Sequence, residues 1–245
     1  MVKLERNYTP IFFSPKNVAI LTADFKNNNT SVWQEDEVKT PLLALSKRKC
    51  AYCEIKLNEK STYLEVEHFK DKSTYPDDVI KWENLLPSCK RCNVHKSTHD
   101  VVQEPIINPC DITPSQHLFL KNYRIKGKTE LGKMTISVLS LNDYEHLVMP
   151  RCEVGAILED KLENALEYIE EYAEKPHHAR KRKIIGLIRG ILKECQGTAI
   201  FSAISSTIVH SSDEYQKLHA GMLHLKLWED SLETLHEQSK RIQLV

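Results

Sequence analysis

The chain has 245 residues, of which 41% are hydrophobic, and its 34 Lys and Arg residues are balanced by 34 Asp and Glu residues. This length accommodates one large domain or two smaller ones, and the zero net charge excludes recruitment to nucleic acid by bulk charge alone. No stretch approaches the roughly 20 apolar residues of a membrane span, which excludes a transmembrane protein. Seven cysteines without an apolar N-terminal signal run predict a reducing, cytoplasmic compartment.

The N-terminal segment, residues 1–45, precedes the part of the chain that is richest in chemistry. Three consecutive asparagines, Asn27–Asn29, predict an exposed turn, and the rest of residues 1–30 carries no clear pattern. Apolar residues around a Thr40-Pro41 start signal predict a helix from about Pro41 to Ser46. This helix would deliver the chain to the first cysteine pair.

The central block, residues 46–104, contains one clearly alternating stretch. Residues 63–69 read as a strand, and strict alternation would place Glu67 and His68 on opposite faces. Both side chains can reach one centre only if the strand ends or bends there. Residues 82–88 predict a second short extended or turn segment, and residues 93–97 a helix that stops before Pro105.

The remainder of the chain predicts a β-hairpin extension, residues 105–150, and a helical C-terminal region, residues 151–245. The turn Lys126–Lys128 and a strand from Met134 to Leu141 define the hairpin. Apolar residues then recur at helical spacing, and a last helix should cover about Asp213 to Gln243. The predicted fold class is therefore α+β.

Two CxxC pairs predict a zinc site. They are Cys50/Cys53 and Cys89/Cys92, and thiolates at this spacing suit a closed tetrahedral structural Zn²⁺ site. The separation of the pairs exceeds the usual ribbon spacing of roughly 15–20 residues, so a folded insert must lie between them. The cysteines Cys110, Cys152 and Cys195 are expected in cores.

The insert between the cysteine pairs carries the residues that phosphodiester hydrolysis requires. His68 can act as the general base, and Glu67 offers a hard oxygen ligand to Mg²⁺ or a similar divalent ion. Asn93, directly after the last cysteine, can supply a second ligand, with His95 as the alternative. Asn84 is better suited to holding the His68 segment through backbone hydrogen bonds. Taken alone, a Glu-His pair on a strand usually lies on a solvated edge of a sheet. Its position between two CxxC pairs favours a catalytic role instead.

Four short motifs occur in this order: Cys50-x-x-Cys53, Glu67-His68, Asn84-Leu85-x-Pro87 and Cys89-x-x-Cys92-Asn93-x-x-Lys96. Together they resemble the motif of the zinc-containing HNH endonucleases. The resemblance covers about 50 residues and implies a ββα-metal nuclease core. It implies His68 as base, Glu67 and Asn93 as catalytic metal ligands, Asn84 as the organising residue, and the four cysteines as the zinc site. Two positions depart from the usual motif, since Glu67 replaces an aspartate and Asn93 a histidine. Lys96 would contact phosphate.

The flanking sequence resembles the HNH nuclease subunits of the Septu and retron-linked anti-phage systems, the PtuB family. The residues concerned lie after the nuclease block: Ile107-Asn108-Pro109, Pro114-x-x-His117, Gly127, residues 135–142 and Arg151. This resemblance implies bacterial defence by cleavage of nucleic acid, either DNA or a structured RNA such as tRNA. It also implies an ABC or SMC-like ATPase partner of the PtuA type and, in the retron-linked systems, a reverse transcriptase with its nucleic acid. The C-terminal helices, with the basic run Arg180–Lys183, would be the docking surface or ordinary core.

Two other functions remain compatible with the sequence. One is a zinc-stapled nucleic-acid-binding module without catalysis, in which Lys47–Lys49 and Lys90-Arg91 contact phosphates and His68 is structural. The other is a restriction or homing nuclease that acts alone. A stand-alone nuclease should carry its own DNA-reading element, and no basic helix-turn-helix pattern is present in the sequence.

Overall fold

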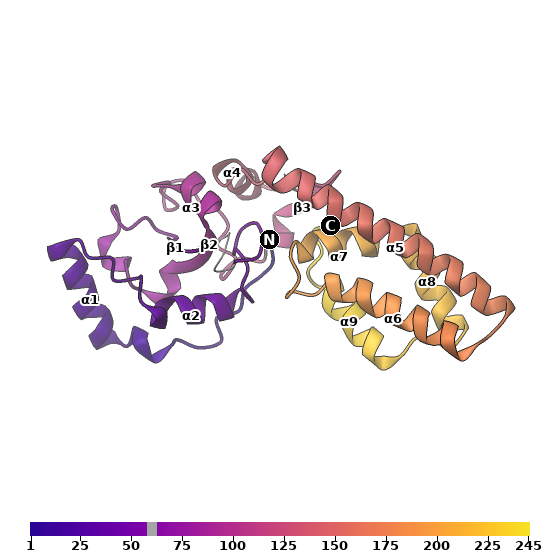
Figure 1. The fold of residues 1–245 in the computed structure, drawn as a ribbon. Helices are drawn as coiled ribbons and strands as arrows, with labels where there is room; N and C mark the ends of the chain where they lie inside the picture. The colour runs from indigo at the N-terminus through magenta and orange to yellow at the C-terminus, as the bar shows by residue number, and fades with distance from the viewer. Residues whose placement is uncertain (58–62) are drawn as a thin grey trace. The chain divides into compact units, whose positions relative to one another are not determined.

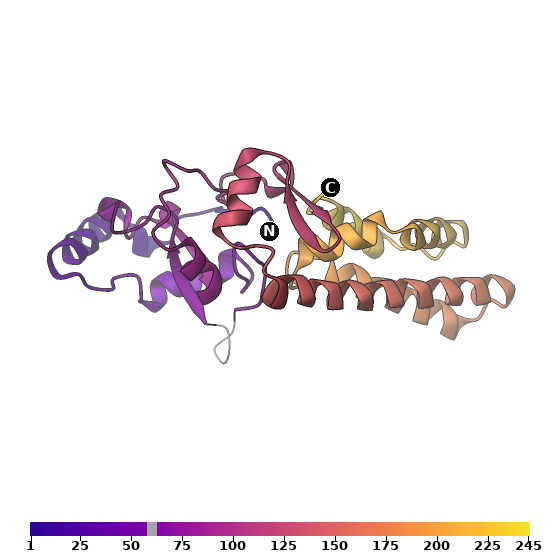
Figure 2. The ribbon, with the colours of Figure 1, turned by 90° about the horizontal axis from the view of Figure 1, so that it is seen from above.

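The computed structural model describes residues 1–57 and 63–245. The chain divides into two compact units, the first formed by residues 1–118 and 126–141 and the second by residues 119–125 and 142–245. Figures 1 and 2 trace the elements of each unit along the chain, and each unit has its own hydrophobic core. Helices together with two small two-stranded sheets confirm the α+β class.

The centre of the first unit is a ββα arrangement. Strand β1 (Leu64–His68) pairs antiparallel with β2 (Leu85–Cys89), and helix α3 (Lys90–Lys96) follows β2 directly. In this register His68 lies opposite Leu85 at the end of β1. The predicted ββα core is therefore confirmed, and the strand ends at His68, one residue before its predicted end.

Two N-terminal helices pack in the same unit. Helix α1 (Pro15–Asn28) ends at Asn29, whose left-handed φ of 54° makes the expected exposed turn. Helix α2 (Asp36–Leu45) begins five residues before the predicted start, so Pro41 lies inside the helix rather than at its first turn. The acidic residues Asp36 and Glu37 explain the earlier start, because they stabilise the positive end of the helix dipole.

The predicted strand Met134–Leu141 is wrong, because residues of this segment form helix α4 (Glu130–Val138). The Thr129 hydroxyl caps the helix by accepting a hydrogen bond from the Gly132 amide at 3.2 Å. Inside the helix, the Thr135 hydroxyl accepts from the Ile107 amide at 2.8 Å. The cap and this tertiary contact outweigh the strand preference of the β-branched residues.

A hairpin is confirmed in this region, but its turn does not lie at the predicted Lys126–Lys128. Strands β3 (Leu118–Lys121) and β4 (Arg124–Gly127) are joined by Asn122 and Tyr123, with φ of 50° and 60°. Two positive φ angles are typical of a tight hairpin turn. Gly127 is instead needed for close packing, since a Cβ there would lie 2.5 Å from the Lys133 amide nitrogen. Figure 2 shows the hairpin clearly.

The second unit is a helical bundle. The predicted helix over 213–243 is broken in two, because Lys226 adopts a left-handed φ of 55° and the chain folds back. This fold-back buries Met222 and Leu232 in the shared core. Across the described residues, no helix combines the length and apolarity needed to span a bilayer. The helices of this unit are α5 (Met149–Glu174), α6 (His178–Glu194), α7 (Ser202–Ser211), α8 (Asp213–His224) and α9 (Asp230–Lys240).

Short helical turns connect these elements. They are the 3-10 turns η1 (Ile11–Phe13), η2 (Pro76–Asp78), η3 (Trp82–Asn84) and η4 (Pro114–Gln116), and the π-helical turn η5 (Tyr144–Val148). Turn η3 leads straight into β2, which agrees with the extended or turn segment predicted for residues 82–88.

We expect the core of the second unit to depend on Ile188 in α6, which is fully buried. Ile188→Ala should lower the free energy of unfolding by about 2–5 kcal/mol, because it leaves a cavity. Ile157→Ala in α5 is the matched control, since Ile157 is 55% exposed and its loss should cost at most about 0.5 kcal/mol. Urea unfolding followed by circular dichroism measures both, and equal effects would contradict the packing.

Candidate functional site

The four cysteines of the CxxC pairs form one buried cluster. Their sulfur atoms all lie within 4.8 Å of one another, and the sulfurs of Cys53 and Cys89 are 3.7 Å apart. A tetrahedral zinc ion with Zn–S bonds of about 2.3 Å would place its sulfurs about 3.8 Å apart. The cluster therefore fits one Zn²⁺, and it is the only group of this kind that the described residues form.

Local backbone contacts build this cluster. Cys50 and Cys53 lie on a tight turn, and the Ala51 amide in that turn donates to the Pro87 carbonyl of β2 at 2.8 Å. Cys89 ends β2, and Cys92 lies in the first turn of α3. Hydrogen bonding to Cys50, together with burial, raises the pKa of the Cys53 and Cys92 thiols well above the usual value. A bound cation would favour the charged thiolate form at these two positions.

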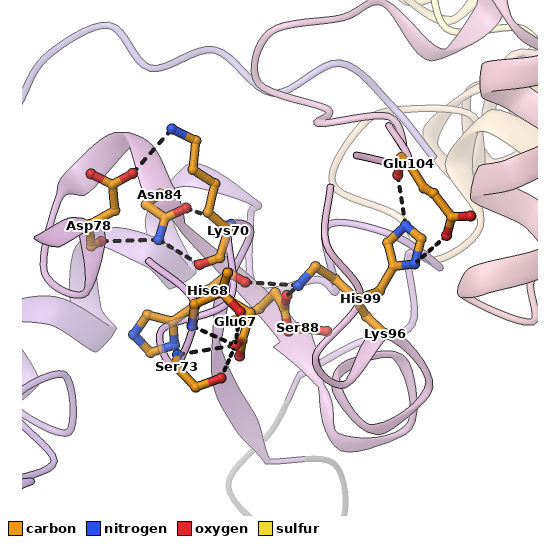
Figure 3. A network of polar contacts seen from close by, with 12 residues as sticks. Glu67, His68, Lys70, Ser73, Asp78, Asn84, Ser88, Lys96, His99 and Glu104 are labelled. Atoms are coloured by element: carbon orange, nitrogen blue, oxygen red, sulfur yellow. Dashed lines mark hydrogen bonds and ion pairs between the residues drawn. The ribbon is translucent and has the colours of Figure 1, made fainter. Parts of the chain in front are cut away.

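Glu67 is buried beside a single ammonium group. Its Oε1 lies 2.7 Å from Nζ of Lys96, and both side chains are at most 2% exposed. The same ammonium donates to the His68 carbonyl at 2.9 Å (Figure 3). Burial raises the pKa of Glu67 to about 7, although Lys96 opposes this shift. Burial makes the ionised form of this carboxylate unfavourable unless a cation lies beside it, and this property suits a metal ligand.

Lys96 therefore has a different environment from the one that the sequence predicts. It was expected to contact phosphate, but its side chain is buried within the ββα core and bonded to β1. In the structure it connects α3 to the strand end that carries Glu67 and His68. Its ammonium supplies the positive charge beside Glu67 that burial of the carboxylate requires.

His68 is held by a backbone carbonyl and an aromatic ring. Its Nε2 lies 3.0 Å from the Val79 carbonyl oxygen, and its ring packs edge-to-face on Trp33 at a centroid distance of 4.8 Å. A carbonyl oxygen can only accept, so Nε2 carries the proton and Nδ1 keeps its lone pair. Burial, followed by the charge of Lys72, lowers the pKa of His68 to about 3. The ring is therefore neutral at neutral pH and able to accept a proton.

The side chains of Glu67 and His68 are neighbours in sequence but face different parts of the unit. Figure 3 shows the carboxylate directed toward Lys96 and the imidazole directed to the other side of the strand end. Within the described residues no hydrogen bond or ion pair joins the two side chains. The alternation of β1 thus persists to its last residue.

Asn84 shapes the loop that follows His68. Its Oδ1 accepts from the Lys70 amide at 2.7 Å, and its Nδ2 donates to the carbonyls of Lys70 and Asp78, each at 3.0 Å. Asp71 adds to the loop by accepting from the Ser73 amide at 3.0 Å. The side-chain amide of Asn84 thus makes backbone hydrogen bonds only, in keeping with a residue that positions the His68 segment.

Asn93 and His95 occupy different faces of α3. At about 100° per residue, Asn93 lies about 60° from Lys96 around the helix, whereas His95 lies about 100° from Lys96 and about 160° from Asn93. Asn93 is half-buried and His95 is exposed. Of the two, Asn93 therefore lies nearer around the helix to Lys96, the residue of α3 that contacts Glu67.

Trp33 and Lys72 were not among the residues predicted for the site. Trp33 lies between α1 and α2, in a segment with no sequence signal, and reaches His68 only through the fold. Lys72 lies four residues after His68, and its Nζ is 5.1 Å from the centroid of the Trp33 ring. A lysine in a loop carries no distinguishing pattern, so only the structure could have found it.

Two basic residues of the binding-module alternative are already engaged. Lys49 is buried, and its Nζ lies 3.0 Å from Oε2 of Glu54. Arg91 donates to the Ser140 carbonyl at 2.5 Å. These contacts disfavour both residues as surface contacts to phosphate.

Comparison with known proteins places this site in a family. A family model described as HNH endonuclease matches residues 50–99, which include the four clustered cysteines and the end of β1. A Septu protein PtuB of Bacillus thuringiensis is 39% identical over 247 residues, an alignment that covers all of this chain and 96% of that protein. This chain belongs to the PtuB family.

Further comparisons agree with this assignment. A second Septu protein PtuB, from Bacillus mycoides strain KBAB4, is 31% identical over 162 residues, which cover 53% of this chain and 54% of that protein. No solved structure gives a significant match. With an HNH endonuclease domain at residues 50–99, this PtuB family member is a nuclease.

We expect the first unit to depend on the metal bound by its four cysteines. Cys89→Ser should lose bound zinc and helical signal, because the free energy of about 10–16 kcal/mol released by structural zinc is also folding free energy. The matched control is Cys152→Ser, which removes a partly exposed thiol of the second unit and should retain zinc. Atomic emission spectroscopy and circular dichroism measure these outcomes. A folded Cys89→Ser protein with full zinc content would contradict the site.

We expect Lys96→Met to destabilise the chain by about 3–5 kcal/mol, because it leaves the Glu67 carboxylate buried without its cation. Lys90→Met is the matched control on the same helix, since Lys90 is exposed. Adding Glu67→Gln to Lys96→Met should recover part of the loss by removing the buried charge. Urea unfolding of the zinc-loaded proteins measures the series. Equal stability of the Lys96 and Lys90 variants would argue against the buried pair.

Proposed function

We propose that this PtuB-family chain is the effector nuclease of a bacterial anti-phage defence system and acts in the cytoplasm. It would hydrolyse phosphodiester bonds in nucleic acid with His68 as the general base. A divalent ion such as Mg²⁺ would be held by Glu67 and Asn93, and a structural Zn²⁺ by the four cysteines. The match of residues 50–99 to HNH endonucleases supports the chemistry, and the family supports the defence role.

The observation that carries this proposal is the state of His68. Its Nε2 is committed to the Val79 carbonyl, so the free lone pair is on Nδ1. Burial lowers the pKa of the ring to about 3, so the ring is neutral at working pH but weakly basic, and the water it deprotonates would need the divalent ion to make it more acidic. The Val79 contact and the edge-to-face packing on Trp33 restrict ring rotation. Asn84 supports this arrangement from the following loop.

The residues around Glu67 fit a hard divalent ion. A buried carboxylate and the amide oxygen of a half-buried asparagine on the adjacent face of α3 are oxygen donors of the kind that Mg²⁺ prefers. When bound, the ion supplies positive charge to the scissile phosphate. His95, exposed on another face, is the less favoured ligand. Lys96 would stay beside Glu67 and hold the strand end in place.

The family resemblance supports a partner. We propose an ABC or SMC-like ATPase subunit of the PtuA type, with a retron reverse transcriptase and its nucleic acid as a further possible assembly. The helical second unit offers the docking surface, and the start of α6 carries the basic run Arg180–Lys183, in which Arg182 and Lys183 are exposed. An assembly of this kind would control when the nuclease acts.

We expect the zinc-loaded chain to cleave plasmid DNA or cellular RNA in the presence of Mg²⁺ and not in EDTA. His68→Ala should reduce the cleavage rate by about 10²–10⁴-fold, the usual contribution of a general base. Gel-based cleavage assays measure the rates, and zinc content with circular dichroism checks that the variant is folded. Binding without cleavage by the wild-type chain, alone and with its ATPase partner, would favour the non-catalytic module instead.

The two candidate ligands on α3 can be separated in the same assay. Asn93→Ala should raise the Mg²⁺ concentration needed for half-maximal rate, whereas His95→Ala should leave it unchanged, because Asn93 lies nearer around the helix to Lys96, which contacts Glu67. The reverse result would assign the ligand to His95.

A further inference from the structure

A tryptophan and a lysine from distant parts of the chain meet beside His68. Trp33 packs edge-to-face on the His68 ring, with an interplanar angle of 86°, and also packs on Phe25 of α1 at 5.8 Å. The ammonium of Lys72 lies 5.1 Å from the centroid of the same indole. Trp33 and Lys72 are half-buried, whereas His68 is only 6% exposed. Both side chains therefore border the solvent beside the proposed base.

Lys72 differs from the other lysines near His68 in its charge balance. Lys70 and Lys81 both pair with Asp78, at 3.1 Å and 2.5 Å. Lys96 is buried against Glu67. Within residues 1–57 and 63–245, no carboxylate oxygen lies within the 4.0 Å ion-pair distance of the Lys72 ammonium. Lys72 thus has no ion-pair partner among the described residues, although its charge is among those that lower the pKa of the neighbouring Asp71 carboxyl, after the hydrogen bonds from Ser73 and Thr74.

The position of this charge matters for the site. Through its contact with Trp33, which packs on the His68 ring, the ammonium lies close to the end of β1 that carries His68. The indole face attracts the cation and holds its stem, but the ring carries no negative charge. A held, partly exposed and unpaired ammonium beside a proposed base fits an anionic ligand. In a nuclease the anion that must reach this place is the phosphodiester.

We propose that Lys72 binds the scissile phosphate of the nucleic acid and that Trp33 positions both Lys72 and the His68 ring. This inference rests on the proposed nuclease function. Lys72 would contact a non-bridging phosphate oxygen and stabilise the charge that develops there. Trp33 would act only through its two neighbours, as a positioning residue. Lys96, which the sequence favoured as the phosphate contact, is excluded from this role by its burial.

The first test compares three variants of the full zinc-loaded chain. Lys72→Met keeps the apolar stem on Trp33 and removes the charge, Lys72→Arg keeps the charge, and Lys81→Met is the matched control from the same loop. We expect Lys72→Met to lose about 10²–10³-fold in kcat/KM, Lys72→Arg to recover most of it, and Lys81→Met to stay near wild type. A Lys72→Met protein as active as Lys81→Met would overturn the inference.

A binding measurement tests the contact between Lys72 and phosphate without requiring cleavage. In a His68→Ala background, the affinity for a labelled short DNA duplex, and for a labelled RNA hairpin in parallel, is measured against salt concentration. Removing one phosphate contact should lower the slope of log K against log salt by about 1 for Lys72→Met and leave it unchanged for Trp33→Phe. An unchanged slope for Lys72→Met would overturn the phosphate contact. If the wild-type chain still cleaved nucleic acid, an unchanged slope would overturn only the Lys72 contact and leave the proposed nuclease function intact.

The positioning role of Trp33 has its own signature. Trp33→Leu should lower kcat by displacing the His68 ring and raise KM by displacing the Lys72 ammonium, and Trp33→Phe should restore both through its remaining ring. Thermal unfolding of both variants checks their stability. Equal kcat for the Leu and Phe variants would remove Trp33 from the proposal.

Discussion

Four buried sulfur atoms connect the two ends of the nuclease core, and the other parts of the site depend on this connection. The first pair lies on a turn hydrogen-bonded to β2, and the second pair ends β2 and begins α3. A metal ion shared by these sulfurs would therefore fix the first turn of α3 against the hairpin. Only then can α3 present its inner face to the end of β1. The two cysteine pairs thus stand on either side of Glu67 and His68 because the metal must join the segments before and after this part of the chain.

Buried charge is the second constraint on the core. An ion pair removed from water is a weak stabiliser, because desolvation offsets most of the attraction. The Glu67–Lys96 pair makes better sense as a means of holding position, since the same ammonium also bonds the His68 backbone. One lysine of α3 thereby restrains two consecutive residues of β1. The side chain of the proposed metal ligand and the backbone carbonyl of the proposed base therefore share one contact.

The environment of His68 is assembled from segments that are far apart in the chain. The loop between α1 and α2 supplies Trp33, the segment after β1 supplies Lys72, and the segment before β2 supplies the Val79 carbonyl and Asn84. The N-terminal helices are therefore part of the nuclease unit rather than a leader to it. The helices of the second unit form a separate core.

The ββα core was implied by the resemblance of the motif to HNH endonucleases, whereas the sequence by itself determined the four-cysteine cluster and the strand that carries Glu67 and His68. These features depend on spacing and alternation, which are local properties of the chain. Only the tertiary structure decided that residues 134–138 are helical, since a Thr129 cap and a contact from Ile107 outweigh the β-branched preference. It also decided the burial of Lys96 and the place of Trp33 beside His68, because both arise from contacts between residues remote in sequence, which no local pattern encodes.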